Sequence, residues 1–237
     1  MSNPYFRFKQ FEVLQERCAM KVTTDACIQG AWTQLEPGVK RVLDIGAGTA
    51  LLSLMLAQRN PDIIIDAIEL DSDAAGEGRG NAMRSSWGSR INVLKGDVRY
   101  YSFEHKYDFI ISNPPFFTDS LLGKEARENI AYHTRSLSHA ELLIAIDARL
   151  EEDGYFSILL PVAEYELWLK LTKAKHWFEI NRLSVRHKKE AIVKRVVGIF
   201  CRKEGPVVQH DELIIMDDSN NYSRDFIDLL SPFYLNL

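Results

Sequence analysis

Short apolar runs alternate with amphipathic stretches along the first two thirds of the chain. Polar or glycine-rich residues bound these runs, which predict strands at 41–45, 63–68, 91–94, 106–111 and 155–160. Between them, apolar residues at helical spacing predict helices over 51–57, 73–86, 139–150 and 163–173. This regular alternation predicts an α/β fold, doubly wound around a mainly parallel sheet.

The last third of the chain is richer in strand-like segments. Predicted strands span 177–185, 193–202 and 212–216, followed by a short helix over 224–230. We expect a late antiparallel strand in this part of the sheet. At the other end, an aromatic-rich stretch becomes helical from about Thr24, and Thr24 or Asp25 is expected to cap that helix. We expect a single domain over residues 1–237, with residues 1–36 as an amino-terminal extension.

The stretch Ser112–Phe117 follows the strand at 106–111 and combines an amide with two prolines. Each proline fixes its own φ and restricts the preceding residue, so Asn113 is expected to be extended at the carboxyl edge of the sheet. Ligands of open α/β sheets bind at that edge. The Asn113 amide, the Pro114 carbonyl and the Phe116 ring then suit a flat group with an NH2, such as adenine. A ligand-free Asn-Pro turn packed by phenylalanines is the alternative explanation.

A glycine turn, Gly46–Gly48, joins the strand at 41–45 to the helix at 51–57. Glycines let the backbone approach a ligand, and the following helix offers free N–H groups. A dinucleotide fingerprint would place a third glycine at position 51, where the chain has Leu51. A pyrophosphate ligand is therefore disfavoured.

Carboxylates follow the next two strands. Glu69, at the end of the strand at 63–68, is well placed to accept both hydroxyls of a ribose. It is preferred to Asp71 because it comes first after the strand. Asp97 follows the strand at 91–94 and is a candidate acceptor for an adenine amino group. Each carboxylate alone has the ordinary explanation of a helix cap or a solvated loop residue, but their succession at strand ends favours a nucleoside site.

Composition excludes several classes of protein. The chain has 237 residues, of which 46% are hydrophobic and 26% charged, as in an ordinary globular protein. No apolar run is long enough to cross a bilayer and the first residues lack signal-peptide features, so we expect a cytoplasmic protein with no membrane partner. Cys18, Cys27 and Cys201 show neither disulfide nor zinc-site spacing, and no metal is expected. The oligomeric state is open, with a monomer favoured.

Charge is distributed very unevenly. The net charge is −4, yet residues 170–203 hold eleven basic and two acidic residues, a local balance of +9 against −13 for the remainder. Such asymmetry is typical of a localised phosphate footprint, whose acidic surroundings keep polyanions away elsewhere. The alternative is a strand surface solvated by lysines.

The motifs resemble those of the class I S-adenosylmethionine-dependent methyltransferases that methylate amines. The resemblance is carried by Asp44–Gly48, Glu69, Gly96–Asp97 and Asn113–Phe116. Further matches at Phe8–Phe11, Cys18–Ala26 and Gly30–Trp32 resemble the bacterial tRNA adenine N6-methyltransferases that modify the purine beside the anticodon of a valine tRNA. With these matches the resemblance covers nearly the whole chain.

The resemblance implies a Rossmann-like, seven-stranded sheet and S-adenosylmethionine as cofactor. It places the Gly46–Gly48 turn against the amino acid part of the cofactor, Glu69 at the ribose and Asp97 at the adenine. Residues 1–36 would lie over the cofactor. The implied cofactor-binding residues are Lys21, Thr24, Asp44, Gly46, Gly48, Glu69 and Asp97, with Asp25 in the same amino-terminal segment.

One departure is Ala50, where many methyltransferases have a third glycine. Alanine is still small, so we expect little effect on the site.

The implied reaction transfers a methyl group to the N6 amine of a tRNA adenine. Its implied catalytic residues are Asn113, Pro114, Pro115 and Phe116, where the Asn113 and Pro114 oxygens accept the two amine hydrogens and Phe116 stacks on an extruded base. Its implied substrate contacts are Phe116, Phe117, Lys188, Lys189, Lys194 and Arg195. Residues 117–136 form a polar loop that would close over the substrate, in which His133 and Arg135 are substrate contacts or ordinary loop residues.

Other substrates fit part of this pattern. Methyltransferases acting on protein glutamine share the Asn-Pro-Pro motif, but they do not need a basic segment and often carry Tyr where this chain has Phe116. Methylation of ribosomal guanine N2 or of DNA adenine N6 is a nearer alternative. A non-catalytic RNA-binding module is disfavoured because every motif position is present.

Overall fold

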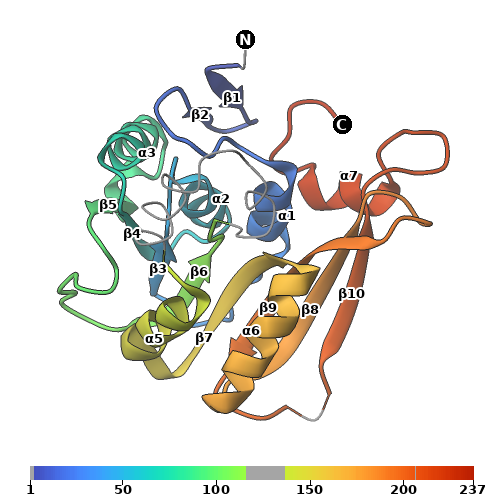
Figure 1. The fold of residues 1–237 in the computed structure, drawn as a ribbon. Coiled ribbons are helices and arrows are strands. Elements are labelled where there is room, and N and C mark those ends of the chain that lie inside the picture. Colours follow the sequence, from blue (N-terminus) through green and yellow to red (C-terminus); the bar gives the residue numbers. More distant parts are fainter. Residues whose placement is uncertain (1–2, 116–136, 206) are drawn as a thin grey trace, which may run out of the picture.

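The computed structural model describes residues 3–115, 137–205 and 207–237. Its centre is a twisted sheet with the strand order β10-β8-β9-β7-β6-β3-β4-β5 (Figure 1). The strands are β3 (Arg41–Ile45), β4 (Ile64–Glu69), β5 (Ile91–Lys95), β6 (Tyr107–Ser112), β7 (Leu150–Pro161), β8 (Phe178–Arg186), β9 (Val193–Cys201) and β10 (Gln209–Ile214). The helices are α1 (Thr24–Trp32), α2 (Leu51–Arg59), α3 (Ser72–Arg84), α5 (His139–Arg149), α6 (Val162–Ala174) and α7 (Arg224–Leu230).

The doubly wound, mainly parallel fold is confirmed, including the late antiparallel strand. The strands β5, β4, β3, β6 and β7 pair in parallel, and β9 pairs antiparallel with both β7 and β8. The sheet has eight strands, as many as the apolar segments predicted and one more than the resemblance implied. The strand predicted at 212–216 is β10, whose six residues pair in parallel along β8 and extend the sheet on that side.

Strand residues alternate between two hydrophobic cores, one on each face of the sheet. Val42 and Phe109 belong to the core that also contains the buried faces of α1, α2 and α7. Leu43 and Ile110 belong to the second core, which α5 and α6 cover. Successive side chains of a strand point to opposite faces, so uninterrupted apolar strands require helices on both sides. This explains why the short apolar runs of the sequence predicted the architecture.

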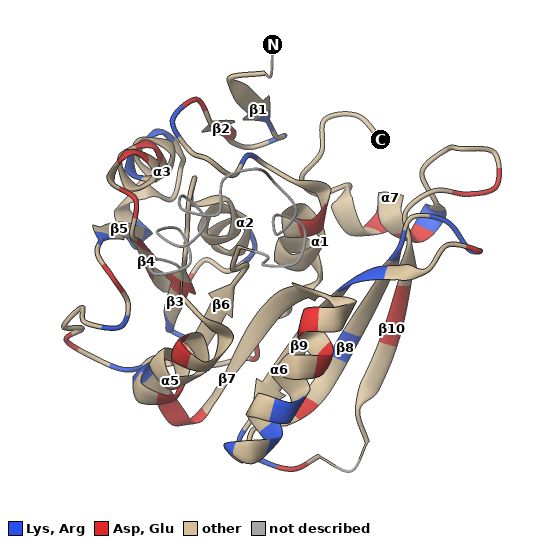
Figure 2. Cartoon of the chain, in the orientation of Figure 1, with Lys and Arg blue, Asp and Glu red and all other residues tan. Residues whose placement is uncertain are grey.

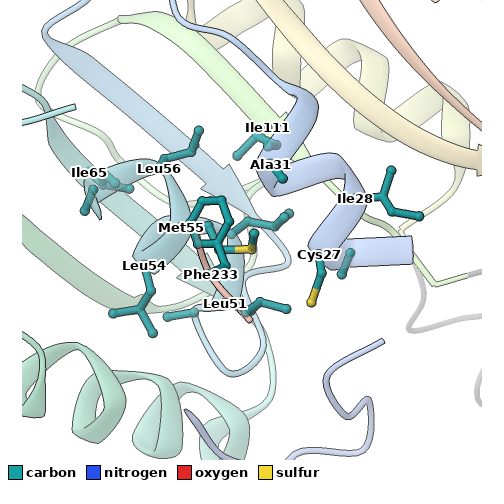
Figure 3. Close-up of a cluster of buried hydrophobic side chains, with 14 of the residues drawn as sticks. Cys27, Ile28, Ala31, Leu51, Leu54, Met55, Leu56, Ile65, Ile111 and Phe233 are labelled. Carbon is teal, nitrogen blue, oxygen red and sulfur yellow. The ribbon is translucent and has the colours of Figure 1, made fainter. Parts of the chain in front are cut away.

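Helices α1 and α2 pack closely together on the first face (Figure 3). Their shared cluster contains Ile28 of α1 and Met55 of α2, both fully buried. A Cβ atom at Gly30 would lie 2.7 Å from the sulfur of Met55, so glycine at this position permits the contact.

The amino-terminal segment differs from its prediction in two respects. Tyr5–Arg7 (β1) and Glu12–Leu14 (β2) form a small antiparallel hairpin that the aromatic-rich sequence did not indicate. The cap of α1 is Thr23, not Thr24 or Asp25. Thr23 is extended and its hydroxyl accepts from the Ala26 N–H at 3.2 Å, so the cap is the residue before the predicted start of the helix at Thr24.

Helix α3 carries three glycines, and one of them marks a close approach. A Cβ at Gly78 would lie 2.7 Å from the carbonyl oxygen of Gly48. Gly76, in the same helix, is exposed and has nothing within 4 Å of that position. The glycine content of α3 therefore has a packing reason at Gly78, where helix and glycine turn meet.

None of the helices in the described segments has the length and apolarity needed to cross a bilayer.

Replacing these two glycines should have opposite effects on stability. Gly76→Ala should raise the free energy of unfolding by up to about 1 kcal/mol, because alanine has the higher helix propensity and the new methyl group meets no atom. Gly78→Ala should lower it by about 1 to 3 kcal/mol, because the methyl group collides with main chain. Urea unfolding of both variants checks this, and equal shifts of the same sign would contradict the close approach.

Asp44 is a fully buried carboxylate in the central strand β3. Its Oδ2 accepts from the Ser53 hydroxyl at 2.7 Å and from the Ser53 N–H at 3.2 Å, which ties β3 to α2. No described residue donates to its Oδ1. Burial raises the pKa of Asp44 to about 7, against the lowering effect of the Ser53 bonds.

The raised pKa of Asp44 predicts a specific pH dependence of stability. Between about pH 4 and about pH 7 the folded protein holds a proton that the unfolded chain releases, so stability falls as pH rises through this window and levels off above it. Relative to Asp44→Asn, the wild type should lose about 2 to 3 kcal/mol between about pH 5 and about pH 8, at roughly 1.4 kcal/mol per pKa unit. Denaturant unfolding of both proteins measures this, and parallel pH curves would refute it.

Candidate active site

The predicted site positions lie side by side along one edge of the sheet. Ile45 of β3 pairs with Ile68 of β4 on one side and with Ser112 of β6 on the other. On the outer side of β4, Glu69 pairs with Lys95 of β5. Because these strands are parallel and in register, their carboxyl ends meet at one edge. Asp97, Glu69, the Gly46–Gly48 turn and Asn113 follow one another there in the order of the strands.

The glycine turn adopts the left-handed backbone that glycine favours. Gly46 has φ 74° and Gly48 has φ 52°. Ala50 has φ 63° and is fully buried. The expectation that Ala50 fits because it is small is therefore incomplete, since its methyl group sits on a left-handed residue at a cost of about 1 kcal/mol.

Glu69 holds the glycine turn directly. Its Oε2 accepts from the Gly48 N–H at 2.9 Å and its Oε1 accepts from the Asp71 N–H at 2.8 Å. Each carboxylate oxygen keeps a lone pair for a further donor. Asp71 instead caps α3, where it accepts from the Asp73 and Ala74 N–H groups at 3.0 and 2.8 Å. Asp71 is therefore engaged as a helix cap, whereas Glu69 holds the glycine turn and keeps acceptor capacity.

Asp97 lies at the predicted edge, but its carboxylate is bound by Arg99. The Arg99 guanidinium reaches Asp97 at 2.6 Å and Glu141 of α5 at 2.9 Å. Hydrogen bonds from Arg99 lower the pKa of Asp97 and keep it ionised. The sequence did not single out Arg99, which fixes this end of the edge.

Asn113 follows directly on β6, and its amide oxygen is the most distinctive atom of the site. The Asn113 Oδ1 is buried, and no described residue donates to it. Pro114 is buried beside it. A buried amide oxygen without a donor is costly, so the position is suited to an incoming N–H group. Phe116 and Phe117, like His133 and Arg135, lie outside the described residues.

The buried amide of Gln29 holds the residue that precedes Asn113. Gln29 of α1 is fully buried, and its Nε2 donates to the Ser112 carbonyl at 3.0 Å and contacts the Ser157 hydroxyl at 3.3 Å. The Ser112 hydroxyl in turn donates to the Ile45 carbonyl at 2.9 Å. Gln29 was missed in the sequence, where the signal was a single amide between Ile28 and Gly30 on an otherwise apolar helix.

The amino-terminal segment lies against the glycine turn. The sulfur of Cys18 is 3.4 Å from the position of a Cβ on Gly48. Lys21 is half-buried, and Thr24 is exposed at the first residue of α1. Asp25 forms an ion pair with Arg195 of β9 at 3.0 Å, so this end of α1 lies at the same edge of the sheet as the site.

The basic segment divides into two groups at opposite edges of the sheet (Figure 2). Pro161 at the carboxyl end of β7 pairs with Arg195, which brings the β8–β9 hairpin to the edge that carries Asn113. At the opposite edge, Phe178 pairs with Cys201, and the lysines at the end of α6 lie there. The second group comprises Lys170, Lys173, Lys175, Arg202 and Lys203.

Ion pairs neutralise part of this charge. The pairs within or next to the basic segment are Arg182–Glu179, Arg186–Glu212, Arg195–Asp25, Arg202–Asp147 and Lys203–Asp153. Lys188, Lys189 and Lys194 form no ion pair with a described acidic residue, and Lys189 and Lys194 are exposed. The four predicted phosphate contacts therefore differ in their ion pairing. Arg195 is paired with Asp25, whereas the three lysines have no described acidic partner.

The residues present fit S-adenosylmethionine. The edge combines carboxylates at Asp44, Glu69 and Asp97 with a turn that has no side chain at Gly46 and Gly48. The sulfonium and the amine of the cofactor carry positive charge, and its amine, ribose hydroxyls and adenine amino group donate hydrogen bonds, which these acceptors complement. The Asp44 Oδ1, which accepts from no described residue, is a further acceptor at the base of the turn.

Comparisons with known proteins identify the family and the fold. The methyltransferase small domain family matches residues 31–154. Among solved structures, one described as a predicted O-methyltransferase from Agrobacterium tumefaciens covers 90% of this chain and 100% of its own with a TM-score of 0.68 and 14% identity. The glycopeptide N-methyltransferase MtfA, solved with S-adenosylmethionine, covers 78% of this chain and 97% of its own with a TM-score of 0.57 and 10% identity. These structures share the fold.

Curated relatives are similar over their full length. A protein of Dyadobacter fermentans is 42% identical, covering 98% of both chains. One from Bacteroides thetaiotaomicron is 38% identical over 100% of both, and one from Klebsiella pneumoniae is 40% identical over 97% of this chain and 94% of its own. All three are named tRNA1(Val) (adenine(37)-N6)-methyltransferase. Because the methyltransferase small domain matches more than half of the chain and these relatives match it at about 40% identity over nearly their full length, the chain belongs to this family of tRNA adenine N6-methyltransferases.

Proposed function

We propose that the protein transfers a methyl group from S-adenosylmethionine to the N6 amine of adenine 37, next to the anticodon of tRNA1(Val). The observation that carries this proposal is the buried Asn113 Oδ1 at the end of β6, which accepts from no described residue and lies next to the carboxylates and the glycine turn. The names of the full-length relatives support the choice of tRNA and of nucleotide.

The cofactor would lie along the edge from Asp97 to the glycine turn. Glu69 would bind the ribose, Asp97 would face the adenine, and Asp44 with Gly46 and Gly48 would border the amino acid part. Lys21 and Thr24, in an extension formed by residues 1–36 of a single domain, would cover it. When bound, the cofactor supplies an electrophilic methyl group on a sulfonium.

The chain's own contribution is to orient a poor nucleophile. The lone pair of the adenine amine is conjugated into the purine, so it is weakly nucleophilic. The Asn113 Oδ1 and the Pro114 carbonyl would each accept one of its N–H groups, which favours a pyramidal nitrogen with its lone pair directed at the methyl group. Asn113 is uncharged, so it aligns the amine and stabilises developing positive charge without removing a proton beforehand. The nitrogen–methyl bond would form as the methyl–sulfur bond breaks, which leaves S-adenosylhomocysteine, and the proton would leave for solvent after the nitrogen has become cationic.

Substrate contacts complete the proposal. Pro115 would hold the motif rigid, and Phe116 would stack on the extruded base, a contact worth on the order of 1 to 3 kcal/mol. Phe117 would line the same pocket. Lys188, Lys189 and Lys194 would bind backbone phosphates, and Arg195 would support them through its ion pair with Asp25.

Loss of the Asn113 amide tests the mechanism. Asn113→Ala should reduce methyl transfer to tRNA by at least about a hundredfold, because one of two orienting acceptors is lost, while cofactor affinity stays within about twofold. The assay uses labelled cofactor and tRNA from cells that lack the enzyme, followed by nucleoside analysis for N6-methyladenosine. Asn92→Ala, on the outer strand β5, is the matched control and should be fully active. Retained activity in Asn113→Ala would refute the proposed mechanism.

The two basic groups provide a matched test of RNA binding. Replacing Lys188, Lys189 and Lys194 by Ala should weaken tRNA binding and reduce the slope of log affinity against log salt by about 2 to 3, close to one per phosphate contact. Replacing Lys170, Lys173 and Lys175 by Ala removes the same charge at the opposite edge and should leave the slope unchanged. Filter binding over a range of salt concentrations measures the slope for each triple variant. Equal slopes for the two variants would show that the β8–β9 hairpin does not bind tRNA.

A further inference from the structure

Asn81 of α3 joins two segments of the site that are far apart in the sequence. It is 1% exposed. Its Nδ2 donates to the Thr49 carbonyl of the glycine turn at 3.0 Å and to the Leu14 carbonyl at 2.9 Å. Its Oδ1 accepts from the Leu14 N–H at 2.9 Å and from Arg84 at 2.6 Å. The amide thus uses both of its donors and both lone pairs of its oxygen.

The same face of α3 makes two more contacts of this kind. One turn before Asn81, the Glu77 carboxylate accepts from the N–H groups of Glu16, Arg17 and Cys18 at 2.7 to 3.2 Å. Gly78 admits the Gly48 carbonyl to within 2.7 Å of where its Cβ would be. One helix face therefore holds both the residues that follow β2 and the turn that follows β3.

These contacts act on a turn whose N–H groups are already bound, since those of Gly46 and Ala47 donate to the Ile68 carbonyl at 2.9 and 3.1 Å. Glu69, at the end of β4, accepts from the Gly48 N–H, and Asn81 of α3 donates to the Thr49 carbonyl. The turn is thus held both from the sheet and from the helix. Glycine adopts the left-handed conformation of Gly46 and Gly48 without strain, but Ala50 is left-handed as well, and a residue with a side chain keeps that conformation only when its surroundings determine it. The peptide between Thr49 and Ala50 is held at both ends, since the Ala50 N–H donates to the Ala47 carbonyl at 2.7 Å and the Thr49 carbonyl accepts from Asn81.

We propose that Asn81 is a positioning residue for the cofactor, which sets the glycine turn and couples it to the amino-terminal segment at Leu14–Cys18. The inference rests on the proposed function, since it concerns the site assigned there to S-adenosylmethionine. Asn81 does not touch that site. It holds the glycine turn and Leu14–Cys18 in the arrangement that binds the cofactor. The entropic cost of ordering these segments on cofactor binding is therefore smaller.

The proposal is tested by calorimetric titration of the full chain with S-adenosylmethionine and with S-adenosylhomocysteine. Asn81→Asp keeps the shape and the acceptor for Leu14 but replaces the donor to Thr49 and Leu14 with an oxygen. It should raise the Kd of both ligands at least about tenfold. At saturating cofactor its kcat, and its KM for tRNA, should stay within about twofold of wild type, a split that general misfolding would not produce.

Asn60→Ala is the matched control. Asn60 caps α2 at the end remote from the turn, where its Nδ2 donates to the Leu56 carbonyl at 2.9 Å. It should lower the melting temperature with no change in cofactor Kd. If Asn81→Asp likewise lowers only the melting temperature and keeps its Kd within about twofold of wild type, the positioning role is refuted.

A second variant keeps the test decisive if Asn81→Asp does not fold. Glu77→Ala releases the amides of residues 16–18 without touching the turn, and should raise the cofactor Kd about threefold or more. In the wild type, cofactor should slow hydrogen exchange at Leu14 and at residues 16–18, and in Glu77→Ala this protection at 16–18 should be lost. Unchanged Kd and unchanged protection would overturn the coupling. A wild type that binds no S-adenosylmethionine would refute the proposed function instead.

Discussion

The in-register parallel pairing of β4, β3 and β6 is the constraint on which the site depends. One ladder sets where all three strands end, so the glycine turn, Glu69 and Asn113 arrive at one edge although they are far apart in the sequence. A slip of one residue would exchange the two faces of a strand and move its terminal side chain away from that edge. The buried alternation of Val42 and Leu43 between the two cores prevents this slip. Core packing and the alignment of the site thus have the same cause.

Several buried polar groups lie behind the edge, where apolar side chains would be more stabilising. Asp44, Gln29 and Asn81 are each at most 1% exposed. Gln29 and Asn81 bind the carbonyls of Ser112 and Thr49, next to Asn113 and Gly48, and Asp44 ties β3 to Ser53 of α2. Within the described residues, the Asp44 Oδ1 and the Asn113 Oδ1 have no donor, which adds further cost. This pattern is typical of proteins that give up stability to hold a site in one geometry.

Much of the fold followed from the sequence because buried parallel strands and their helices have strong local patterns, and the motif residues lie directly at the ends of those strands. What did not follow depends on contacts between distant segments. The β1–β2 hairpin is hydrogen-bonded to Asn81 of α3, and the ion pair of Arg195 with Asp25 joins β9 to α1. The division of the basic segment between two edges required the registers of β8 and β9. The substitution of Ala50 for glycine was judged by size, whereas its positive φ is visible only in the structure.

The reversed direction of β9 has a consequence for how such an enzyme can diversify. Because β9 is antiparallel to β7 and β8, the short connection from β8 to β9 lies at the edge of the sheet that carries Asn113. This connection contains Lys188 and Lys189. In the proposed function the cofactor lies at the ends of β3, β4 and β5, and β6 and β7 separate these strands from the β8–β9 hairpin. Changes in the length or charge of the hairpin would then alter what approaches the edge without disturbing the residues around the glycine turn. On this proposal, substrate and methyl donor are recognised by different parts of one sheet, which can change independently.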